Sequence, residues 1–336
     1  MKAAVMKGIN KGIIVEDLPD PVPAGDEIVI EQKQTGVCYR DILTYTGFFP
    51  RAKFPIVPGH EISGKIIATG PNVRNFKVGD RVATLIYIPC GICKFCLTGR
   101  ENLCPNKRTM GENLQGSYAK YVKVPERIAV PVPASVPEEM ATITACVTAM
   151  VYHAISVVGG CRTGIRILIT GASGGVGSNA IQIAHALGCE VFAYTSSADK
   201  KEAIYSFGAD YVLTGENFDR DVKNISGDGV DIVLEAVGMP TFLKSFRSLA
   251  FGGRMIVVGN IEPKNAELPI GAMILKGNRV EGSISSTRYD MVSTLRLAER
   301  GKIKHIGTAH FGLSEIEKAY SFIRSKNHTG RVFIDV

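Results

Sequence analysis

The 336-residue chain lacks any apolar run long enough to span a bilayer, and its first residues, Met1–Lys7, lack the apolar stretch and small-residue cleavage site of a signal peptide. We therefore expect no membrane association and a cytoplasmic protein. The chain also lacks a block of like charges, because its 39 Lys and Arg are scattered among 32 acidic residues. A formal charge of +7 could suggest a nucleic-acid partner, but this scattered distribution argues against one and suits phosphorylated small molecules.

Without a secretory signal, the eight cysteines should be reduced, so closely spaced ones are metal ligands before they are disulfides. Cys90, Cys93, Cys96 and Cys104 have the spacing C-x2-C-x2-C-x7-C. Four thiolates this close can form a closed tetrahedral shell around a structural zinc ion. Four unligated thiols and a nucleic-acid-binding zinc ribbon are the alternatives, and no basic-aromatic segment supports the ribbon. We treat Cys161 and Cys189 as ordinary reduced residues.

The residue composition and the pattern of apolar residues change along the chain. Up to about residue 130, short β-branched runs are broken by Gly and Pro, which predicts an irregular β-rich domain. From about residue 143, Ala-rich helical segments alternate with compact apolar strands, which predicts a doubly wound parallel six-stranded α/β sheet. The expected strands are Arg166–Thr170, Glu190–Tyr194, Tyr211–Leu213, Asp231–Glu235, Arg254–Val258 and Arg279–Glu281.

After residue 290 the pattern predicts a helix, a strand at His305–Ala309, a helix at Ser314–Ser325 and a terminal strand at Arg331–Val336. We expect these elements to return to the N-terminal domain. The predicted organisation is one domain formed by residues 1–142 and 291–336, with a zinc lobe at about 88–106, and a nucleotide-binding domain at 143–290.

A glycine-rich loop follows the first strand of the predicted parallel sheet. Strand, loop and an apolar-periodic helix at Ser178–Leu187 occur in that order. This order brings unpaired backbone N–H groups and the helix dipole to one point, where a pyrophosphate can bind. A tight turn without a ligand is the alternative. The expected cofactor contacts in the loop are Gly171, Ser173, Gly174, Gly175, Val176 and Gly177.

The end of the second predicted strand carries no Asp or Glu, the residue type that binds the ribose hydroxyls of NAD. Hydroxyl groups and two lysines stand there instead, and they suit a 2′-phosphate, so we predict NADPH in preference to NADH. Lysines that merely solvate a helix start are the alternative. The residues concerned are Thr195, Ser196, Ser197, Lys200 and Lys201.

The segment Gly59-His60-Glu61-x2-Gly64-x5-Gly70-x2-Val73, followed by Phe76–Val82, resembles the zinc alcohol dehydrogenase signature of the medium-chain dehydrogenase/reductase superfamily. The resemblance covers nearly the whole chain. It implies a GroES-like catalytic domain, a Rossmann domain and an active site between them. It also implies a catalytic zinc ion held by Cys38, His60 and Cys146, with Glu61 as an exchangeable fourth ligand, and hence two zinc ions per chain.

The same resemblance implies that Asp41 orients the imidazole of His60, because metal-bound histidines usually donate their other N–H to a carboxylate. It adds Gly259 to the expected cofactor contacts. It further implies a homodimer or a homotetramer that acts on a small molecule. A catalytically silent, redox-sensitive binding protein is the alternative from another functional class.

One position departs from the alcohol dehydrogenases, which carry a proton-relaying Ser or Thr two residues after the first zinc cysteine. Arg40 occupies that position. The segment Cys38–Asp41 instead resembles quinone and enoyl-thioester reductases, and the segments Cys38–Pro50, Cys146–Thr148 and Gly259–Lys276 are similar to archaeal acryloyl-CoA reductases. This implies an enoyl-CoA substrate, with an alcohol or aldehyde as the alternative. Tyr39 is a candidate proton donor or a packing residue.

Overall fold

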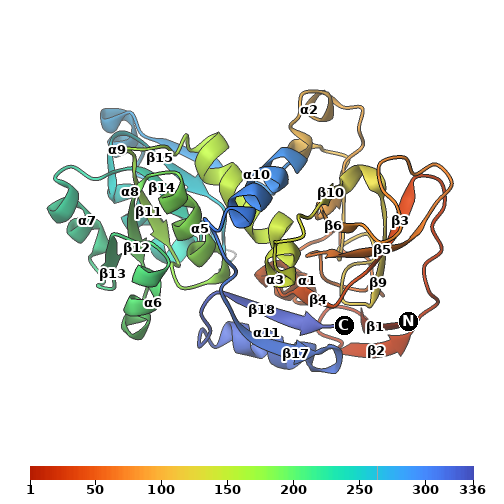
Figure 1. The fold of residues 1–336 in the computed structure, drawn as a ribbon. Helices are drawn as coiled ribbons and strands as arrows, with labels where there is room; N and C mark the ends of the chain where they lie inside the picture. The colour runs from red at the N-terminus through yellow and green to blue at the C-terminus, as the bar shows by residue number, and fades with distance from the viewer. Residues whose placement is uncertain (263) are drawn as a thin grey trace. The chain divides into compact units, whose positions relative to one another are not determined.

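The computed structural model describes residues 1–262 and 264–336, which form two compact units (Figure 1). Unit 1 comprises Met1–Ala149, Ser285–Arg300 and Gly307–Val336, and unit 2 comprises Met150–Ile284 and Gly301–Ile306. The predicted boundaries after residues 142 and 290 are displaced, because helix α10 (Arg288–Glu299) packs against the segment Thr144–Ala149 and keeps it in unit 1. No helix among the described residues has the length and apolar character needed to cross a membrane.

Unit 1 is built around a five-stranded antiparallel sheet in the order β10-β6-β5-β3-β9. Its strands are β3 (Glu27–Glu31), β5 (Ser63–Thr69), β6 (Arg81–Thr84), β9 (Tyr121–Pro125) and β10 (Ala129–Pro131). The central residues of β3, Ile28–Ile30, are all buried, so this β-branched run is covered on both sides. Two antiparallel pairs complete the β-rich part, namely β1 (Lys2–Met6) with β2 (Ile13–Asp17) and β7 (Tyr87–Ile88) with β8 (Arg108–Thr109).

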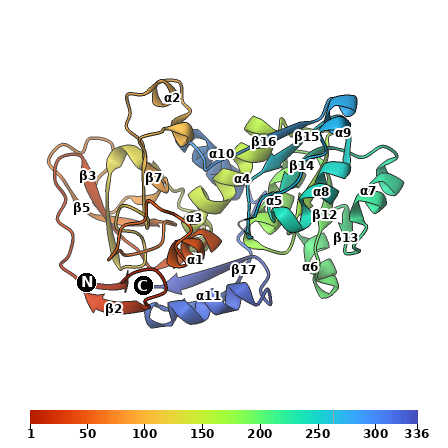
Figure 2. The same ribbon diagram turned by 180° about the vertical axis from the view of Figure 1, so that it is seen from behind.

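The C-terminal segment returns to unit 1, as expected from the sequence. Strand β18 (Arg331–Asp335) pairs in parallel with β17 (Gly307–Gly312) and antiparallel with β4 (Gln34–Gly36). Helix α11 (Ile316–Arg324) lies along β17 and β18 in both views (Figures 1 and 2). Its buried face joins one hydrophobic cluster with β18 and β1, which fixes β4 and the segment after it.

The remaining helices of unit 1 are short. They are α1 (Tyr39–Tyr45), α2 (Lys94–Leu97), α3 (Glu138–Thr142) and the single turns Glu101–Leu103, Glu126–Ile128 and Leu313–Glu315. The helical segment that follows α3 is interrupted at Cys146, whose φ of −122° and ψ of 91° are not helical. A π-helical turn, Thr144–Ala149, surrounds this kink. Such turns are frequent at functional sites because they redirect a side chain.

Unit 2 contains the parallel six-stranded sheet, in the order β13-β12-β11-β14-β15-β16. Its strands are β11 (Arg166–Thr170), β12 (Glu190–Tyr194), β13 (Tyr211–Leu213), β14 (Val230–Glu235), β15 (Leu249–Val257) and β16 (Arg279–Gly282). The chain runs outward from β11 in both directions, so the strand order reverses between β11 and β14, the point at whose carboxyl ends doubly wound folds bind dinucleotides. The predicted fold class is confirmed.

The helices of unit 2 are α4 (Met150–Tyr152), the π-helical turn His153–Val158, α5 (Gly175–Ala186), α6 (Lys201–Ser206), α7 (Phe218–Ser226), α8 (Met239–Arg247) and α9 (Ile270–Lys276), with a 3₁₀ turn at Ala198–Lys200 (Figure 2). Helix α5 begins three residues earlier than the predicted Ser178 because Gly175 and Gly177 already lie in its first turn. Strand β15 is longer than predicted because Leu249 pairs with β14 before an irregularity in register. Pro263, inside the segment compared with acryloyl-CoA reductases, lies outside the described residues.

Candidate active site

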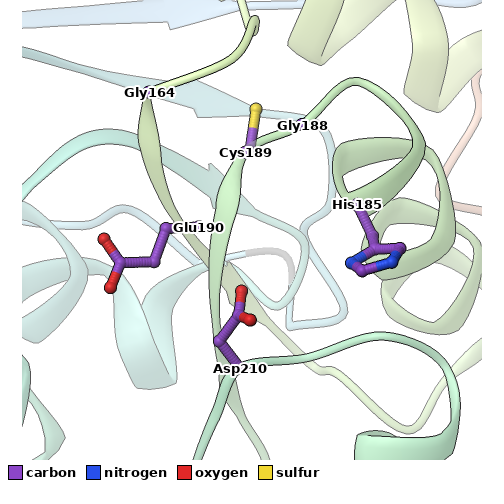
Figure 3. Close-up of a pocket in the computed structure, with 6 residues that line it drawn as sticks. All are labelled: Gly164, His185, Gly188, Cys189, Glu190 and Asp210. Carbon is purple, nitrogen blue, oxygen red and sulfur yellow. The ribbon is translucent and has the colours of Figure 1, made fainter.

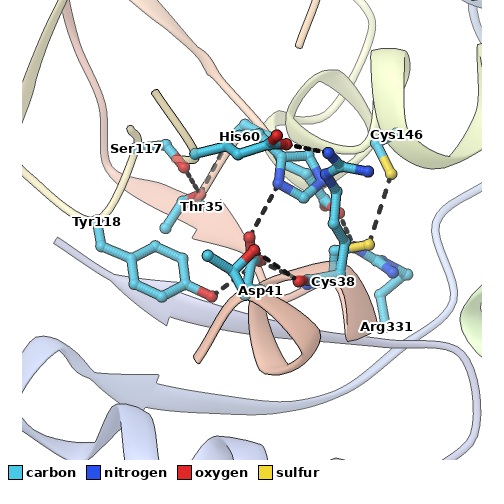
Figure 4. A network of polar contacts seen from close by, with 12 residues as sticks. Thr35, Cys38, Asp41, His60, Ser117, Tyr118, Cys146 and Arg331 are labelled. Atoms are coloured by element: carbon cyan, nitrogen blue, oxygen red, sulfur yellow. Dashed lines mark hydrogen bonds and ion pairs between the residues drawn. The ribbon is translucent and has the colours of Figure 1, made fainter. Parts of the chain in front are cut away.

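Three residues that are far apart in the sequence come together in unit 1. Cys38 begins helix α1, His60 precedes β5, and Cys146 lies at the kink after α3. Their ligand atoms, with a carboxylate oxygen of Glu61, all lie within 4.8 Å of one another (Figure 4). The Sγ atoms of Cys38 and Cys146 are 3.8 Å apart. A tetrahedral zinc site with Zn–S bonds of about 2.3 Å requires two sulfurs about 3.8 Å apart.

The imidazole of His60 has one engaged and one open nitrogen. Nδ1 lies 2.9 Å from Oδ1 of Asp41, and Figure 4 shows the ring between this carboxylate and the cysteine sulfurs. Nε2 is buried and has no hydrogen-bond partner within the described residues. A buried ring nitrogen without a partner is costly unless a ligand satisfies it. The donor set and this open nitrogen therefore fit a zinc ion.

Asp41 is buried and makes three contacts that orient the cluster. Besides His60, it accepts hydrogen bonds from the backbone N–H of Cys38 at 3.1 Å and from the Tyr118 hydroxyl at 3.2 Å. Asp41 is the third residue of α1, and its carboxylate caps the start of this helix by accepting the backbone N–H of Cys38. One carboxylate thus positions a cysteine and a histidine of the same cluster.

Glu61 is fully buried and forms an ion pair with Arg331 of β18. One oxygen of Glu61, Oε2, has no hydrogen-bond partner among the described residues. Sequence reasoning missed Arg331, because an arginine in a terminal strand carries no motif of its own. Removing one member of a buried ion pair leaves the other charge uncompensated, so this pair holds β18 and the cluster together.

The charges of the cluster perturb one another. Burial disfavours the charged imidazole, but the Asp41 carboxylate outweighs it and raises the pKa of His60 to about 10. Burial raises the pKa of Glu61 to about 7, against the opposing effect of Arg331. The hydrogen bond from Cys146 lowers the pKa of Cys38, and the same bond together with burial raises the pKa of Cys146. This hydrogen bond therefore favours the thiolate form of Cys38 and the thiol form of Cys146.

The four clustered cysteines form a second group of metal ligands in unit 1. Their sulfur atoms all lie within 4.8 Å of one another. The Cys93–Cys96 and Cys90–Cys96 sulfur distances are 3.5 and 4.0 Å, close to the edge of a zinc–thiolate tetrahedron. Backbone N–H groups of Ile92 and Cys93 lower the pKa of Cys90 to about 6, which favours the thiolate form needed for metal binding.

The glycine loop of unit 2 connects β11 to α5 and has the geometry of a phosphate-binding turn. Gly171 has a φ of +62°, a conformation that side chains rarely tolerate. A Cβ atom on Gly177 would collide with the backbone of Gly171 and Ala172, so this glycine permits the close approach of helix and strand. Gly174 caps α5, and Ser173, Gly175 and Val176 are partly exposed in the same turn.

The predicted 2′-phosphate residues lie beyond β12, at the carboxyl edge of the sheet. Thr195 is buried, accepts a hydrogen bond from Ser197 N–H at 3.2 Å, and lies 3.4 Å from the Ser173 hydroxyl, so it links this turn to the glycine loop. Ser196 is exposed, and Lys200 and Lys201 stand at the start of α6. Gly259 is partly exposed beyond β15.

Glu235, at the end of β14, is a further residue that sequence reasoning missed. Its carboxylate is fully buried and accepts hydrogen bonds from Val237 N–H at 2.8 Å and Gly238 N–H at 2.9 Å. It also accepts hydrogen bonds from the hydroxyls of Thr170, Thr241 and Ser245. Because Thr170 directly precedes the glycine loop, this carboxylate fixes the neighbouring turn relative to the loop. Glu235 is recognisable only in the structure, as a buried carboxylate that accepts several hydrogen bonds.

Arg40 and Tyr39 begin helix α1 but face different surroundings. Arg40 forms an ion pair with the largely buried Glu112 and lies over the Phe49 ring, 4.1 Å from its centroid. Tyr39 is half-buried and packs against the hydrophobic cluster of unit 1, which favours the packing alternative over the proton-donor alternative.

Comparison with known proteins agrees with this geometry. Residues 24–134 match the family model of the alcohol dehydrogenase GroES-like domain, and residues 175–300 match that of the zinc-binding dehydrogenases. Acryloyl-coenzyme A reductase of Sulfurisphaera tokodaii is 41% identical over 99% of both chains, and the Metallosphaera sedula enzyme of the same name is 39% identical over 99% of both. An alcohol dehydrogenase of Geobacillus stearothermophilus is 35% identical over 99% of this chain and 98% of its own.

Solved structures give the same result. The crystal structure of AibC superimposes with a TM-score of 0.94 at 36% identity, covering 100% of this chain and 95% of that one. Fold, ligand clusters and relatives together define a zinc-dependent oxidoreductase that uses a nicotinamide cofactor. The chain belongs to the zinc-containing medium-chain dehydrogenase/reductase family, the alcohol dehydrogenase superfamily.

Proposed function

We propose that this protein is an NADPH-dependent reductase of α,β-unsaturated acyl-CoA thioesters, with acryloyl-CoA as a substrate. The observation that carries the proposal is the position of Arg40, two residues after Cys38, where its guanidinium is engaged by Glu112 and Phe49. A guanidinium stays protonated at any working pH, so it cannot relay a proton from an alcohol as a hydroxyl group does. The full-length similarity to two proteins named acryloyl-coenzyme A reductase supports the same choice.

In this proposal Cys38, His60 and Cys146 hold a catalytic zinc ion, Glu61 is the exchangeable fourth ligand, and the four clustered cysteines hold a structural zinc ion. When bound, zinc supplies Lewis acidity towards a substrate carbonyl and the nicotinamide supplies a hydride. Asp41 keeps the proton of His60 on Nδ1 and leaves Nε2 free to coordinate. Burial disfavours the ionised form of Glu61, and the Arg331 guanidinium partly opposes this effect on its pKa.

Unit 2 binds the cofactor in this proposal. The glycine loop and the start of α5 bind the pyrophosphate, while Ser196, Lys200 and Lys201 bind the 2′-phosphate that distinguishes NADPH from NADH. Thr195 and Ser197 support that turn, and Gly259 lets the cofactor approach the backbone. Glu235 holds the adjacent turn in place through its hydrogen bonds to Val237 and Gly238.

We further propose a homodimer, or a homotetramer built from two such dimers, formed through unit 2. Helix α9 packs against β15 and directly precedes the edge strand β16, it has no buried residue, and its Ile274 and Leu275 are 73% and 81% exposed. An exposed apolar helix next to an unpaired strand edge is a surface that monomers rarely retain. A second copy can cover both features at once because a twofold interface is self-complementary.

The test is a spectrophotometric comparison of NADPH oxidation with acryloyl-CoA and with simple aldehydes, using the zinc-loaded enzyme. The proposal expects faster turnover of acryloyl-CoA and a lower KM for NADPH than for NADH. A preference for ethanol, benzyl alcohol or their aldehydes would instead support the alternative, a zinc-dependent alcohol dehydrogenase. The variant Tyr39→Phe tests the proton-donor role, and unchanged kcat would leave Tyr39 as a packing residue.

A further inference from the structure

Two cysteines outside both metal clusters lie together in unit 2. Cys161 and Cys189 form a disulfide, and their Cα atoms are 6.7 Å apart, within the range that disulfides span. The expectation that both are ordinary reduced residues is therefore wrong. Sequence spacing could not show the pairing, because 28 positions separate the two residues and no motif connects them.

The position of this crosslink in the fold is specific. Cys161 precedes β11 and Cys189 directly precedes β12, so both lie at the amino edge of the parallel sheet. The covalent loop between them encloses β11, the glycine loop and α5. The disulfide therefore closes the whole phosphate-binding strand–loop–helix segment, but from the edge of the sheet opposite the glycine loop and Thr195.

A surface pocket reaches one of the two sulfur-bearing residues. The pocket has a volume of about 300 Å³, and its lining consists of Gly164, His185, Gly188, Cys189, Glu190 and Asp210 (Figure 3). Cys189 itself is only 6% exposed, and the pocket is an opening on the surface at this residue. Two carboxylates among the lining residues give it a negative character, part of which Arg166 offsets by its ion pair with Glu190.

We propose that Cys161–Cys189 is a reversible thiol-exchange site that locks the phosphate-binding segment, with a small neutral or cationic dithiol as its reductant. A thiolate of the dithiol attacks Sγ of Cys189, the disulfide breaks, and Cys161 leaves as a thiolate that takes up a proton. The second thiol of the reagent then forms a cyclic disulfide and releases the thiol of Cys189. The protein gains two electrons and two protons, and the dithiol loses them.

The location predicts which property the exchange changes. A crosslink that closes a loop of this length restricts the unfolded chain, so reduction should lower the stability of unit 2. The cofactor residues lie at the opposite edge of the sheet, so reduction should leave the affinity for NADPH unchanged. Local unfolding after reduction should be confined to the segment between Cys161 and Cys189, since the rest of the sheet keeps its hydrogen bonds.

The first experiment maps the cysteines of protein purified in air. Alkylation under denaturing conditions without reductant, followed by peptide mass spectrometry, should recover one peptide pair linked through Cys161 and Cys189. Recovery of both residues fully alkylated would overturn the proposal. The role of the pocket is tested by the rates at which a cationic and an anionic monothiol reduce the disulfide. Each rate is divided by the concentration of the reagent's thiolate form. The cationic reagent should react faster because Glu190 and Asp210 line the approach, and equal rates would overturn this pocket as the entry.

The second experiment measures how reduction of the disulfide changes the stability of the protein and its affinity for NADPH. Mild dithiothreitol treatment, with zinc content checked before and after, should lower Tm by about 5–15 °C and speed hydrogen exchange in α5, while the Kd of NADPH stays the same. The double variant Cys161→Ser/Cys189→Ser should show the lower Tm in both redox conditions. An unchanged Tm on reduction, or a double variant that still responds to the dithiol, would overturn the proposal.

Discussion

Replacement of Asp41 by Asn should weaken zinc binding at the Cys38–His60–Cys146 cluster without removing the side chain's shape. If the amide oxygen faces His60 Nδ1, the amide nitrogen faces the N–H of Cys38, and two donors oppose each other. If the amide nitrogen faces His60, the imidazole proton must move to Nε2, which can then no longer coordinate. Either orientation loses the charge-assisted hydrogen bond that holds the ring.

The magnitude follows from what carboxylate partners of metal-bound histidines contribute, about 10–100-fold in metal affinity or activity, or about 1.4–2.8 kcal/mol. Loss of the helix-start contact to Cys38 should lower the folding stability by about 1 kcal/mol. Asp290→Asn is the matched control. Asp290 is also a buried third residue of a helix, α10, and its Oδ2 accepts the N–H of Thr287 at 2.7 Å.

The assay is zinc release against a chromophoric chelator, with the metal content of each variant measured independently. In the Asp41→Asn variant, one of two zinc ions per chain should be released at a lower chelator concentration, and activity should fall with it. The Asp290→Asn variant should lose thermal stability but keep both ions as the unchanged protein does. Equal zinc retention by the two variants would refute the positioning role of Asp41.

Three further predictions concern other parts of the molecule. Cys96→Ser should lower the zinc content to about one ion per chain and reduce Tm, while the remaining enzyme keeps its KM for NADPH. Loss of both ions would contradict two independent sites. Replacing Lys200 and Lys201 by Glu should raise the KM for NADPH and leave that for NADH nearly unchanged, and a parallel rise in both constants would indicate a structural role. Leu275→Glu should shift the oligomer towards monomer in analytical ultracentrifugation, whereas Val22→Glu, an equally exposed position in unit 1, should not. An unchanged oligomer in both variants would exclude α9 from the interface.

Local patterns were sufficient to predict unit 2. Each strand of a doubly wound sheet is a short apolar run between helices, so β11, β12 and β13 begin and end at the predicted residues. The glycine loop is equally local, since a strand, a turn and a helix start define it. The start of β15 was not predictable, because it depends on a register irregularity opposite β14.

The metal clusters differ in how far the sequence could predict them. The four clustered cysteines lie within one short segment, so their spacing alone indicates a metal site. Cys38, His60 and Cys146 meet only through three elements of unit 1, and resemblance was needed to group them. The partners that fix them, Tyr118 and Arg331, come from further segments, and no local pattern connects those residues to the cluster.

The most direct test of the central claim is anomalous diffraction from crystals of the zinc-loaded protein, recorded on both sides of the zinc absorption edge. The account predicts one anomalous peak between the sulfurs of Cys38 and Cys146 and Nε2 of His60, and a second among the four clustered cysteines. A peak at the clustered cysteines alone, with the Cys38 site empty in fully active crystals, would contradict it.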